Sequence, residues 1–255
     1  MVELVIEYRK KLPKTGTKKL YEYLQPKLME LNIKMGRDAL NDLLRYRGML
    51  IKKTKRFNIT TDSKHFYYKS PNLLTNLLIT HAEQVFVCDI TYIKTDDGHA
   101  YLALVTDAYS RKIMGWCLAD NMKVQMVKEA LQMAFLNCIF NHQSIIHHSD
   151  RGIQYCCPDY SQYAENKGFI LSTTQQYDPY ENAIAERING ILKYEFGLKE
   201  TIKSLEIAKK MVKEAVELYN NQRMHWSLDL KTPQEVHLQY NKHENKNYKK
   251  EKKVV

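Results

Sequence analysis

The sequence predicts an α/β fold in which a mixed β-sheet is flanked by helices and preceded by a helical head. Three observations support this prediction. Three consecutive runs rich in β-branched and aromatic residues begin at residue 85. Segments with the 3.6-residue period of a helix then alternate with short apolar runs up to residue 220. Residues 12–48, in contrast, have helical periodicity without strand-like runs, which separates the head from the sheet.

Two helices are expected in residues 12–48. The first carries a row of leucines: Leu20, Leu24, Leu28 and Leu31. The second carries leucines on one side: Leu40, Leu43 and Leu44. On its other side Arg37, Asn41 and Arg45 recur every four residues, and Gly48 is expected to end the helix. We predict that this pair is a helix-turn-helix that contacts DNA through Arg37, Asn41 and Arg45. An ordinary amphipathic helix pair would show the same pattern.

The expected sheet begins with three antiparallel strands, "VFVCDITYI", "YLALVTDAYS" and "RKIMGWCLA". Asp97-Gly98, between the first two, is a strong hairpin signal. The later elements follow in this order: a helix over 123–140, a strand over 144–150, a helix over 159–168, a strand over 169–172, and helices over 181–197 and 204–220. The order βββαβαβα is typical of a layered α/β domain.

Charge is unevenly distributed along the 255 residues, whose formal net charge is +10. Residues 1–60 carry 15 Lys and Arg against 6 Asp and Glu, and residues 242–255 carry 6 against 2, so the middle is slightly acidic. We expect a DNA-binding head at 1–60, a linker at 61–80, a core with C-terminal helices at 81–241, and a basic, disordered tail at 242–255. Basic ends favour a polyanionic partner, although a solvated basic surface would have the same composition.

Several classes of protein are disfavoured by the sequence. No apolar run approaches the 18 residues of a membrane span. The N-terminal stretch lacks the apolar core and cleavage site of a secretory signal, so the expected location is the cytoplasm. Five cysteines without C-x-x-C spacing argue against a disulfide framework and a zinc site, and favour buried reduced thiols.

Two aspartates lie at positions that suggest a functional role for their carboxylates. Asp89 lies inside the first predicted strand, where an unpaired charge is costly. Asp150 ends the fourth strand, where its side chain could project from the edge of the sheet. If neighbouring strands bring the two together, they repel unless a cation lies between them, and Mg²⁺ prefers such oxygen ligands. Each aspartate alone could instead cap a turn.

A third ligand is expected from the helix that follows the last strand, where four acidic residues are close in sequence. Asp178 precedes a proline and belongs to the loop, and Glu181 suits the helix start because of the helix dipole. Glu195 comes nine residues after Glu186 and therefore faces the opposite side. Small and apolar neighbours let the helix approach a sheet closely at Glu186. We therefore select Glu186.

Four other side chains near these positions could bear on function. Lys193 follows Glu186 by seven residues on the same helix face and could hold a DNA phosphate, or could simply face solvent. His147 and His148 point to opposite faces of their strand, so at most one could join the carboxylates, and either could contact DNA or pack. We expect Trp226 to belong to the core.

The pattern of acids resembles the D,D(35)E signature of retroviral integrases and related transposases. It consists of Asp89, Asp150 and Glu186, and 35 residues lie between the last two. The surrounding words are "DITYI", "HSDRGIQY", "YENAIAERINGILKYE" and "YNNQRMHWSLDLKTPQE". They resemble the OrfB-type transposases of the IS-three insertion-sequence family over roughly residues 80–240. The head resembles the helix-turn-helix of that family. Three residues depart from the usual pattern, none of them an expected ligand: Phe86, Glu181 and Met224.

The resemblance implies an RNase H-like integrase core in which Asp89, Asp150 and Glu186 are the catalytic residues and metal ligands. It implies two Mg²⁺ ions, with Mn²⁺ as a substitute, and cleavage and strand transfer of DNA. The implied partners are the terminal inverted repeats of an insertion sequence, target DNA, further copies of the chain and an upstream OrfA-type protein, all at the cytoplasmic nucleoid. The alternatives are a non-catalytic DNA-binding regulator and an RNase H-like nuclease.

Overall fold

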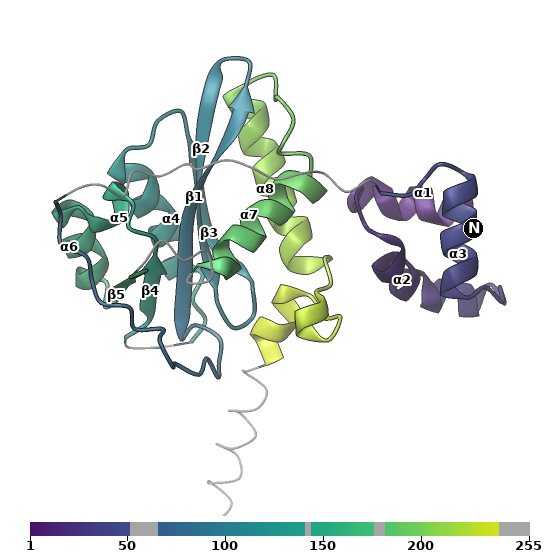
Figure 1. The fold of residues 1–255 in the computed structure, drawn as a ribbon, viewed down its shortest axis with the longest axis horizontal. Helices are drawn as coiled ribbons and strands as arrows, with labels where there is room; N and C mark the ends of the chain where they lie inside the picture. The colour runs from purple at the N-terminus through teal and green to yellow at the C-terminus, as the bar shows by residue number, and fades with distance from the viewer. Residues whose placement is uncertain (52–65, 141–143, 176–181, 240–255) are drawn as a thin grey trace, which may run out of the picture.

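The structure, a computed structural model, describes residues 1–51, 66–140, 144–175 and 182–239 (Figure 1). A small helical head lies to one side of a larger core whose central sheet has helices on both faces. The core is therefore the mixed sheet flanked by helices that the sequence predicts. The predicted tail and residues 61–65 of the expected linker lie outside the described residues, and the division of the chain into domains stays a prediction.

The head contains three helices, one more than expected: α1 (Val2–Lys11), α2 (Thr17–Glu30) and α3 (Arg37–Tyr46). Most of the predicted leucines form its interior, which contains Val5, Leu20, Leu24, Leu28, Leu40 and Leu44. Leu31, expected in the first row, is instead exposed, because α2 ends at Glu30. Gly48 has φ of +65° directly after the cap of α3, which is the left-handed conformation expected where a helix stops. The additional helix, α1, contributes Val5 to this core.

Five strands form one sheet in the order β3-β2-β1-β4-β5. β1 (Val85–Thr95), β2 (Gly98–Asp107) and β3 (Ile113–Ala119) are antiparallel. The predicted hairpin connects the first two, but its turn is Asp96-Asp97, because Gly98 already belongs to β2 and pairs with Thr95. β4 (Ile146–Ser149) pairs in parallel with β1, and β5 (Ile170–Thr173) pairs in parallel with β4. The arrangement makes β1 the central strand, with neighbours on both edges.

One face of the sheet is covered by α4 (Val124–Leu136), the short α5 (Ile153–Cys156) and α6 (Pro158–Asn166). The other face is covered by α7 (Ala183–Glu195) and α8 (Leu205–Asn221), which is followed by a 3₁₀ turn at Trp226–Leu228. The sequence did not predict α5, and the helix predicted over 123–140 ends at Leu136. Side chains alternate along β1, so that Phe86, Cys88 and Ile90 pack on the α4 side. Asp89 consequently faces α7.

A buried polar network joins distant parts of the core. The carboxylate of Asp107 accepts hydrogen bonds from the backbone of Glu83 and from the hydroxyl of Ser110. His237 lies 3.1 Å from Glu83 Oε1, and its Nδ1 lies 3.1 Å from Ser110 Oγ. All four side chains are inaccessible to solvent. The network thus connects His237, in the C-terminal part of the described chain, to Asp107 at the end of β2.

All five cysteines are free thiols, and Cys88, Cys156 and Cys157 are buried. Among the helices that the structure describes, none combines the length and the apolar character needed to traverse a bilayer.

Candidate active site

Asp89 and Asp150 lie next to each other because their strands are parallel neighbours. The register pairs Cys88 of β1 with Ser149 of β4, so the two aspartates are the next residues along two adjacent strands. Both side chains are half-buried at this edge of the sheet. The Asp150 carboxylate also accepts a hydrogen bond of 3.0 Å from the backbone of Gly152, which orients it at the end of its strand.

Glu186 is brought to these aspartates by the first turn of α7. The amide of Asn182 donates to the carbonyl of Cys88 at 3.2 Å, and the amide of Asn189 donates to the Asp89 carboxylate at 2.7 Å. These asparagines precede and follow Glu186 by four and three residues, so all three share one face of the helix. The two hydrogen bonds hold α7 against β1 on either side of Glu186, which is itself exposed.

Electrostatic interactions connect the three carboxylates. The pKa of Asp89 is raised to about 7, first by burial, then by the negative charge of Asp150 and, more weakly, by that of Glu186. Hydrogen bonds from Asn189 and from the backbone of Ile90 oppose this increase. Asp89 therefore experiences the charges of both other acids at a site where a cation would relieve the repulsion.

The donor set fits a hard divalent cation. Three carboxylates supply only oxygen ligands, which is the chemistry that Mg²⁺ and Mn²⁺ prefer. No group of three or more His, Cys, Asp or Glu side chains within the described parts of the chain is already arranged to hold a metal ion. In this structure the Asp89 and Asp150 carboxylates instead accept hydrogen bonds from Asn189 and Gly152.

Lys193 lies on the same face of α7 as Glu186 and Asn189. Its ammonium lies 4.2 Å from the centre of the Tyr92 ring on β1, a cation–π contact. Burial lowers the pKa of Lys193, and the charge of Asp89 opposes that decrease. The lysine is thus near the carboxylates and half-buried, with a positive charge that contacts no carboxylate in an ion pair among the described residues.

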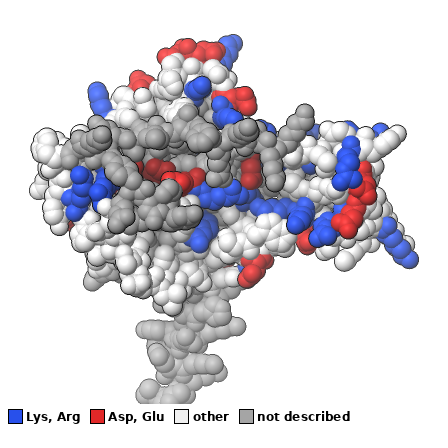
Figure 2. Space-filling view, in the orientation of Figure 1, with Lys and Arg blue, Asp and Glu red and all other residues white. Residues whose placement is uncertain are grey.

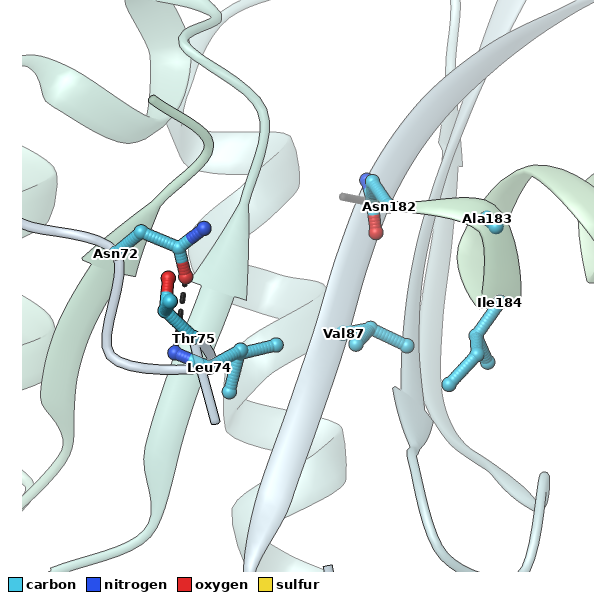
Figure 3. A pocket seen from close by; sticks show the side chains of 7 residues that line it. All are labelled: Asn72, Leu74, Thr75, Val87, Asn182, Ala183 and Ile184. Atoms are coloured by element: carbon cyan, nitrogen blue, oxygen red, sulfur yellow. Dashed lines mark hydrogen bonds between the residues drawn. The ribbon is translucent and has the colours of Figure 1, made fainter. Parts of the chain in front are cut away.

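A cavity of about 350 Å³ lies at the start of α7, and its wall includes Val87 of β1 and Asn182. Figure 3 shows the amides of Asn72 and Asn182 and the hydroxyl of Thr75 toward one end, and Leu74, Val87 and Ile184 toward the other. Asn182 Oδ1 is buried and has no hydrogen-bond partner among the described residues. Apolar walls with a few polar groups are typical of ligand pockets.

The remaining candidates of the core lie elsewhere. His147 shares a hydrogen bond with the hydroxyl of Tyr160, and His148 shares one with Ser172; both histidines are buried, so they pack. Glu195 faces away from Glu186 as expected and forms a bidentate ion pair with Arg223. The alternative acids Asp178 and Glu181 lie outside the described residues.

Trp226 lies in the 3₁₀ turn Trp226–Leu228 that follows α8. Trp226 is 53% exposed, so its assignment to the core is wrong. The turn that carries it follows α8 and places the ring at the surface, which local sequence does not reveal.

The predicted DNA-contacting residues of the head lie on α3, away from the carboxylates. Arg37 and Arg45 are exposed and pair with the neighbouring acids Asp38 and Asp42. Asn41 is half-buried and accepts a hydrogen bond of 3.2 Å from Thr17 at the start of α2. Contact of these three residues with DNA stays a prediction.

A sheet of this order with acids on β1, after β4 and at the start of α7 defines the class of the protein, an RNase H-like domain of the integrase type. The fold is similar to a chain of a simian T-cell lymphotropic virus intasome, with a TM-score of 0.54, 16% identity, and coverage of 87% of this chain and 74% of that one. It is also similar to the HTLV-2 integrase catalytic core domain, solved in complex with magnesium, with a TM-score of 0.50 and 16% identity over 62% of this chain and 97% of that one.

Sequence comparisons identify the family. Two family models, both described as integrase core domain, match residues 79–179 and 167–233. An insertion element IS600 protein of Shigella sonnei is 35% identical over 204 residues, which cover 79% of this chain and 75% of that protein. Transposase InsF of insertion sequence IS3A from Escherichia coli is 34% identical, over 71% of this chain and 64% of that protein. The chain belongs to the IS3 family of insertion-sequence transposases, DNA-recombining enzymes with an integrase core.

A putative transposase of element IS986/IS6110 from Mycobacterium tuberculosis is 34% identical to this chain over 148 residues. The match covers 56% of this chain and about half, 53%, of that protein.

The sequence did not single out Asn182 and Asn189, which form hydrogen bonds with Cys88 and Asp89 on either side of Glu186. Their spacing around Glu186, on the same helix face, was the signal that could have identified them.

Proposed function

We propose that the chain cleaves DNA at the ends of an insertion sequence and joins those ends to target DNA in a metal-dependent reaction. Asp89, Asp150 and Glu186 would act as the metal ligands. The observation that carries this proposal is the parallel register of β1 and β4, which makes Asp89 and Asp150 neighbours at the edge of the sheet where the first turn of α7 carries Glu186. Magnesium in the HTLV-2 integrase domain is consistent with it.

The residues of the chain have distinct tasks in this proposal. Asn182 and Asn189 position α7, and thereby Glu186, against β1. Lys193 offers a positive charge to a phosphate beside the scissile one, and the cavity lined by Val87 and Asn182 would receive the end of the DNA strand. Two Mg²⁺ ions, or Mn²⁺ in their place, would supply charge neutralisation at the phosphorus during an in-line displacement. Water would attack in nicking and a DNA 3′-hydroxyl in joining, so neither step requires a nucleophilic side chain.

The substrates would be the terminal inverted repeats of the element and a target duplex. Copies of the chain would assemble on these ends, consistent with the intasome to which the fold is similar. An upstream OrfA-type protein would be a further partner, and the reaction would take place at the nucleoid in the cytoplasm. The excess of positive charge in residues 1–60 supports a polyanionic substrate.

Incubation of the protein with DNA ends and Mg²⁺ or Mn²⁺, scored for nicks and for joined products, tests the proposal. Asp89→Asn, Asp150→Asn and Glu186→Gln should each abolish both products while DNA binding persists. Glu200→Gln, which changes an exposed acid after α7, is the matched control and should retain activity.

The same assay separates the alternatives. A non-catalytic regulator would bind the ends and leave them intact, and a nuclease would produce nicks without joined products. Parental activity in Glu186→Gln would exclude Glu186 as a ligand and transfer the role to another acid, with Glu181 the next candidate.

A further inference from the structure

The cavity at the start of α7 is bounded by the segment before β1, by β1 itself and by the first residues of the helix. Its volume of about 350 Å³ is at the lower end of the range of about 300–1,000 Å³ for small-molecule sites, so it suits a group of the size of a ring system. Leu74, Val87 and Ile184 form apolar walls (Figure 3). Val87 and Asp89 face α7 from the same side of β1, about 7 Å apart along the strand. The cavity is therefore on the face of the sheet that carries Asp89.

One polar atom at this cavity lacks the hydrogen bond that its position normally provides. Asn182 is the N-cap of α7, where an asparagine oxygen usually accepts from the backbone of the first turn. Here the side chain makes no such bond, and its amide nitrogen instead donates to the carbonyl of Cys88 at 3.2 Å, which fixes the orientation of the group. Asn182 is 6% exposed, and its Oδ1 has no hydrogen-bond partner among the described residues. Figure 3 shows this oxygen on the side of Val87 and the nitrogen on the opposite side, so the unused acceptor is directed at the cavity.

The unused acceptor and the walls define the chemistry of the occupant. A buried acceptor without a donor is costly, and a ligand with an N–H group would remove that cost. No charged side chain is among the described residues that line the cavity, so a phosphate would find no counter-charge there. In contrast, Figure 2 shows a row of Lys and Arg side chains on the surface, which extends from acidic side chains on the core toward the head. A flat, neutral ring with N–H donors fits the cavity, and an unpaired nucleobase has this character.

We propose that the cavity binds one unpaired base from the end of the element DNA, and that an N–H group of this base donates to Asn182 Oδ1. That the occupant belongs to DNA rests on the proposed function. The base packs against Leu74, Val87 and Ile184, and its strand continues along β1 toward Asp89. Extrusion of a base costs the energy of unpairing and unstacking, which the buried hydrogen bond and the apolar contacts offset. The cavity thus holds the end of the strand in one register relative to the acids.

Fluorescence of 2-aminopurine, which increases when the base leaves the stack, locates the bound base. The analogue replaces one base at a time near the end of the duplex, and binding is measured in EDTA to prevent cleavage. With the parent protein, one position should show a several-fold increase over the free duplex. Ala183→Leu and Thr75→Met each enlarge an exposed residue of the wall, from different sides of the cavity, and should abolish this increase. Both variants should retain most of the affinity for the duplex, which phosphate contacts provide.

Thr201→Leu is the matched control, because it makes a similar enlargement at an exposed position that does not line the cavity. It should show the parental increase at the same position of the duplex. Circular dichroism of each variant checks that the helical content is retained.

Base analogues test the hydrogen bond at the position that the fluorescence identifies. A base without the donor on its Watson–Crick edge, such as purine in place of adenine or N3-methylthymine in place of thymine, should weaken binding to the parent several-fold. The same replacement should have little effect on Ala183→Leu and on Thr75→Met, because in these variants the base does not enter the cavity. Equal effects on the parent and on both variants would contradict the hydrogen bond to Asn182.

The fluorescence measurement can also exclude the pocket as a whole. An increase at no position, or one that persists in both enlarged variants, would show that the cavity holds no base. Since neither measurement needs catalysis, a protein that extrudes the base and never cuts would refute the proposed function and leave the base pocket intact. Cleavage and joining without any increase in fluorescence would refute the base pocket alone.

Discussion

Gly115 shows at the scale of one residue how closely the layers of the core approach. It lies in β3 beneath α4, where a Cβ atom would be 2.1 Å from the carbonyl oxygen of Ala130 and 2.6 Å from the amide nitrogen of Ala134. Real atoms do not approach so closely, so the helix packs on the strand only because this side chain is absent. Small residues on both elements thus set the distance between layers.

Gly115→Ala should therefore destabilise the protein, because the added methyl group must push α4 away from β3. We expect a loss of about 3 kcal/mol in the free energy of unfolding, measured by urea denaturation. Gly36→Ala is the control: nothing lies within 4 Å of its Cβ position, and only the helix N-cap preference changes. Equal losses in the two variants would contradict the packing argument.

Asn189→Ala should change the metal requirement of the reaction. The amide donates to ionised Asp89 and so lowers its pKa. Without this hydrogen bond the pKa rises above its present value of about 7, and more of Asp89 is protonated at neutral pH. The Mg²⁺ concentration for half-maximal cleavage should rise about ten-fold at pH 7 and return toward that of the parent as the pH increases.

Cleavage rates measured against Mg²⁺ concentration at several pH values check this prediction. The exposed Asn121, changed to Ala, is the control. A metal requirement that is equal in Asn189→Ala and the parent at every pH would show that Asn189 does not tune Asp89.

At the scale of one element, α7 carries the polar side chains of the site in a single row. Asn182 caps its start, and Glu186, Asn189 and Lys193 follow at intervals of four, three and four residues. These intervals keep the side chains on one face of a helix, toward β1. The opposite face contains Glu195, which pairs with Arg223. One helix thus directs the polar side chains of the candidate site toward β1 and contacts the C-terminal segment on its other side.

Lys193→Glu should weaken the binding of DNA ends irrespective of their sequence, since an ammonium contacts phosphate as a point charge. The slope of log affinity against log salt should fall by about one. Metal affinity should change much less than in Glu186→Gln. Lys199→Glu is the control, because Lys199 also lies over a tyrosine ring but is exposed beyond the end of α7. Parental binding and joining at every salt concentration would identify Lys193 as a surface lysine.

At the scale of the whole molecule, a few polar contacts connect parts that are distant in sequence. Tyr23 joins the head to residues 222–224, and His237 joins the C-terminal part of the described chain to Glu83 and Asp107. Burial alone would lower the pKa of His237, but hydrogen bonds with Asp107 and Glu83 outweigh it, and the pKa is raised. The protonated histidine is therefore stabilised between two buried acids.

The stability that His237 provides should depend on pH. Because its pKa is raised on folding, its contribution is fully present below about pH 6.5, the pKa in the unfolded chain, and is lost as the pH rises through the folded value. His237→Gln should lower the free energy of unfolding by about 3 kcal/mol at pH 6 and by less as the pH increases. Urea denaturation from pH 6 to pH 9 measures this, with the exposed His99→Gln as the control. A difference that grows with pH would contradict the assignment.

Local patterns in the sequence determined much of the fold and the three acids. The β-branched and aromatic run of β1, the hairpin signalled by Asp97-Gly98 and the stop at Gly48 depend on neighbouring residues, so they could be predicted without tertiary contacts. Asp89 and Asp150 could be selected because a charge inside a strand or at its end is unusual, and Glu186 because its small and apolar neighbours suit a helix that packs closely on a sheet.

Only the tertiary structure decided which side chains meet. The hydrogen bond between Asn189 and Asp89 joins residues 100 positions apart, and the one between Tyr23 and Gln222 joins residues 199 positions apart. Periodicity reports which face of an element is apolar, but it does not report what lies across that face. For the same reason the exposure of Trp226 was mispredicted and the pairing of Glu195 with Arg223 was not foreseen. Such contacts depend on how helices and strands pack, and packing is set by the summed interactions of the whole core.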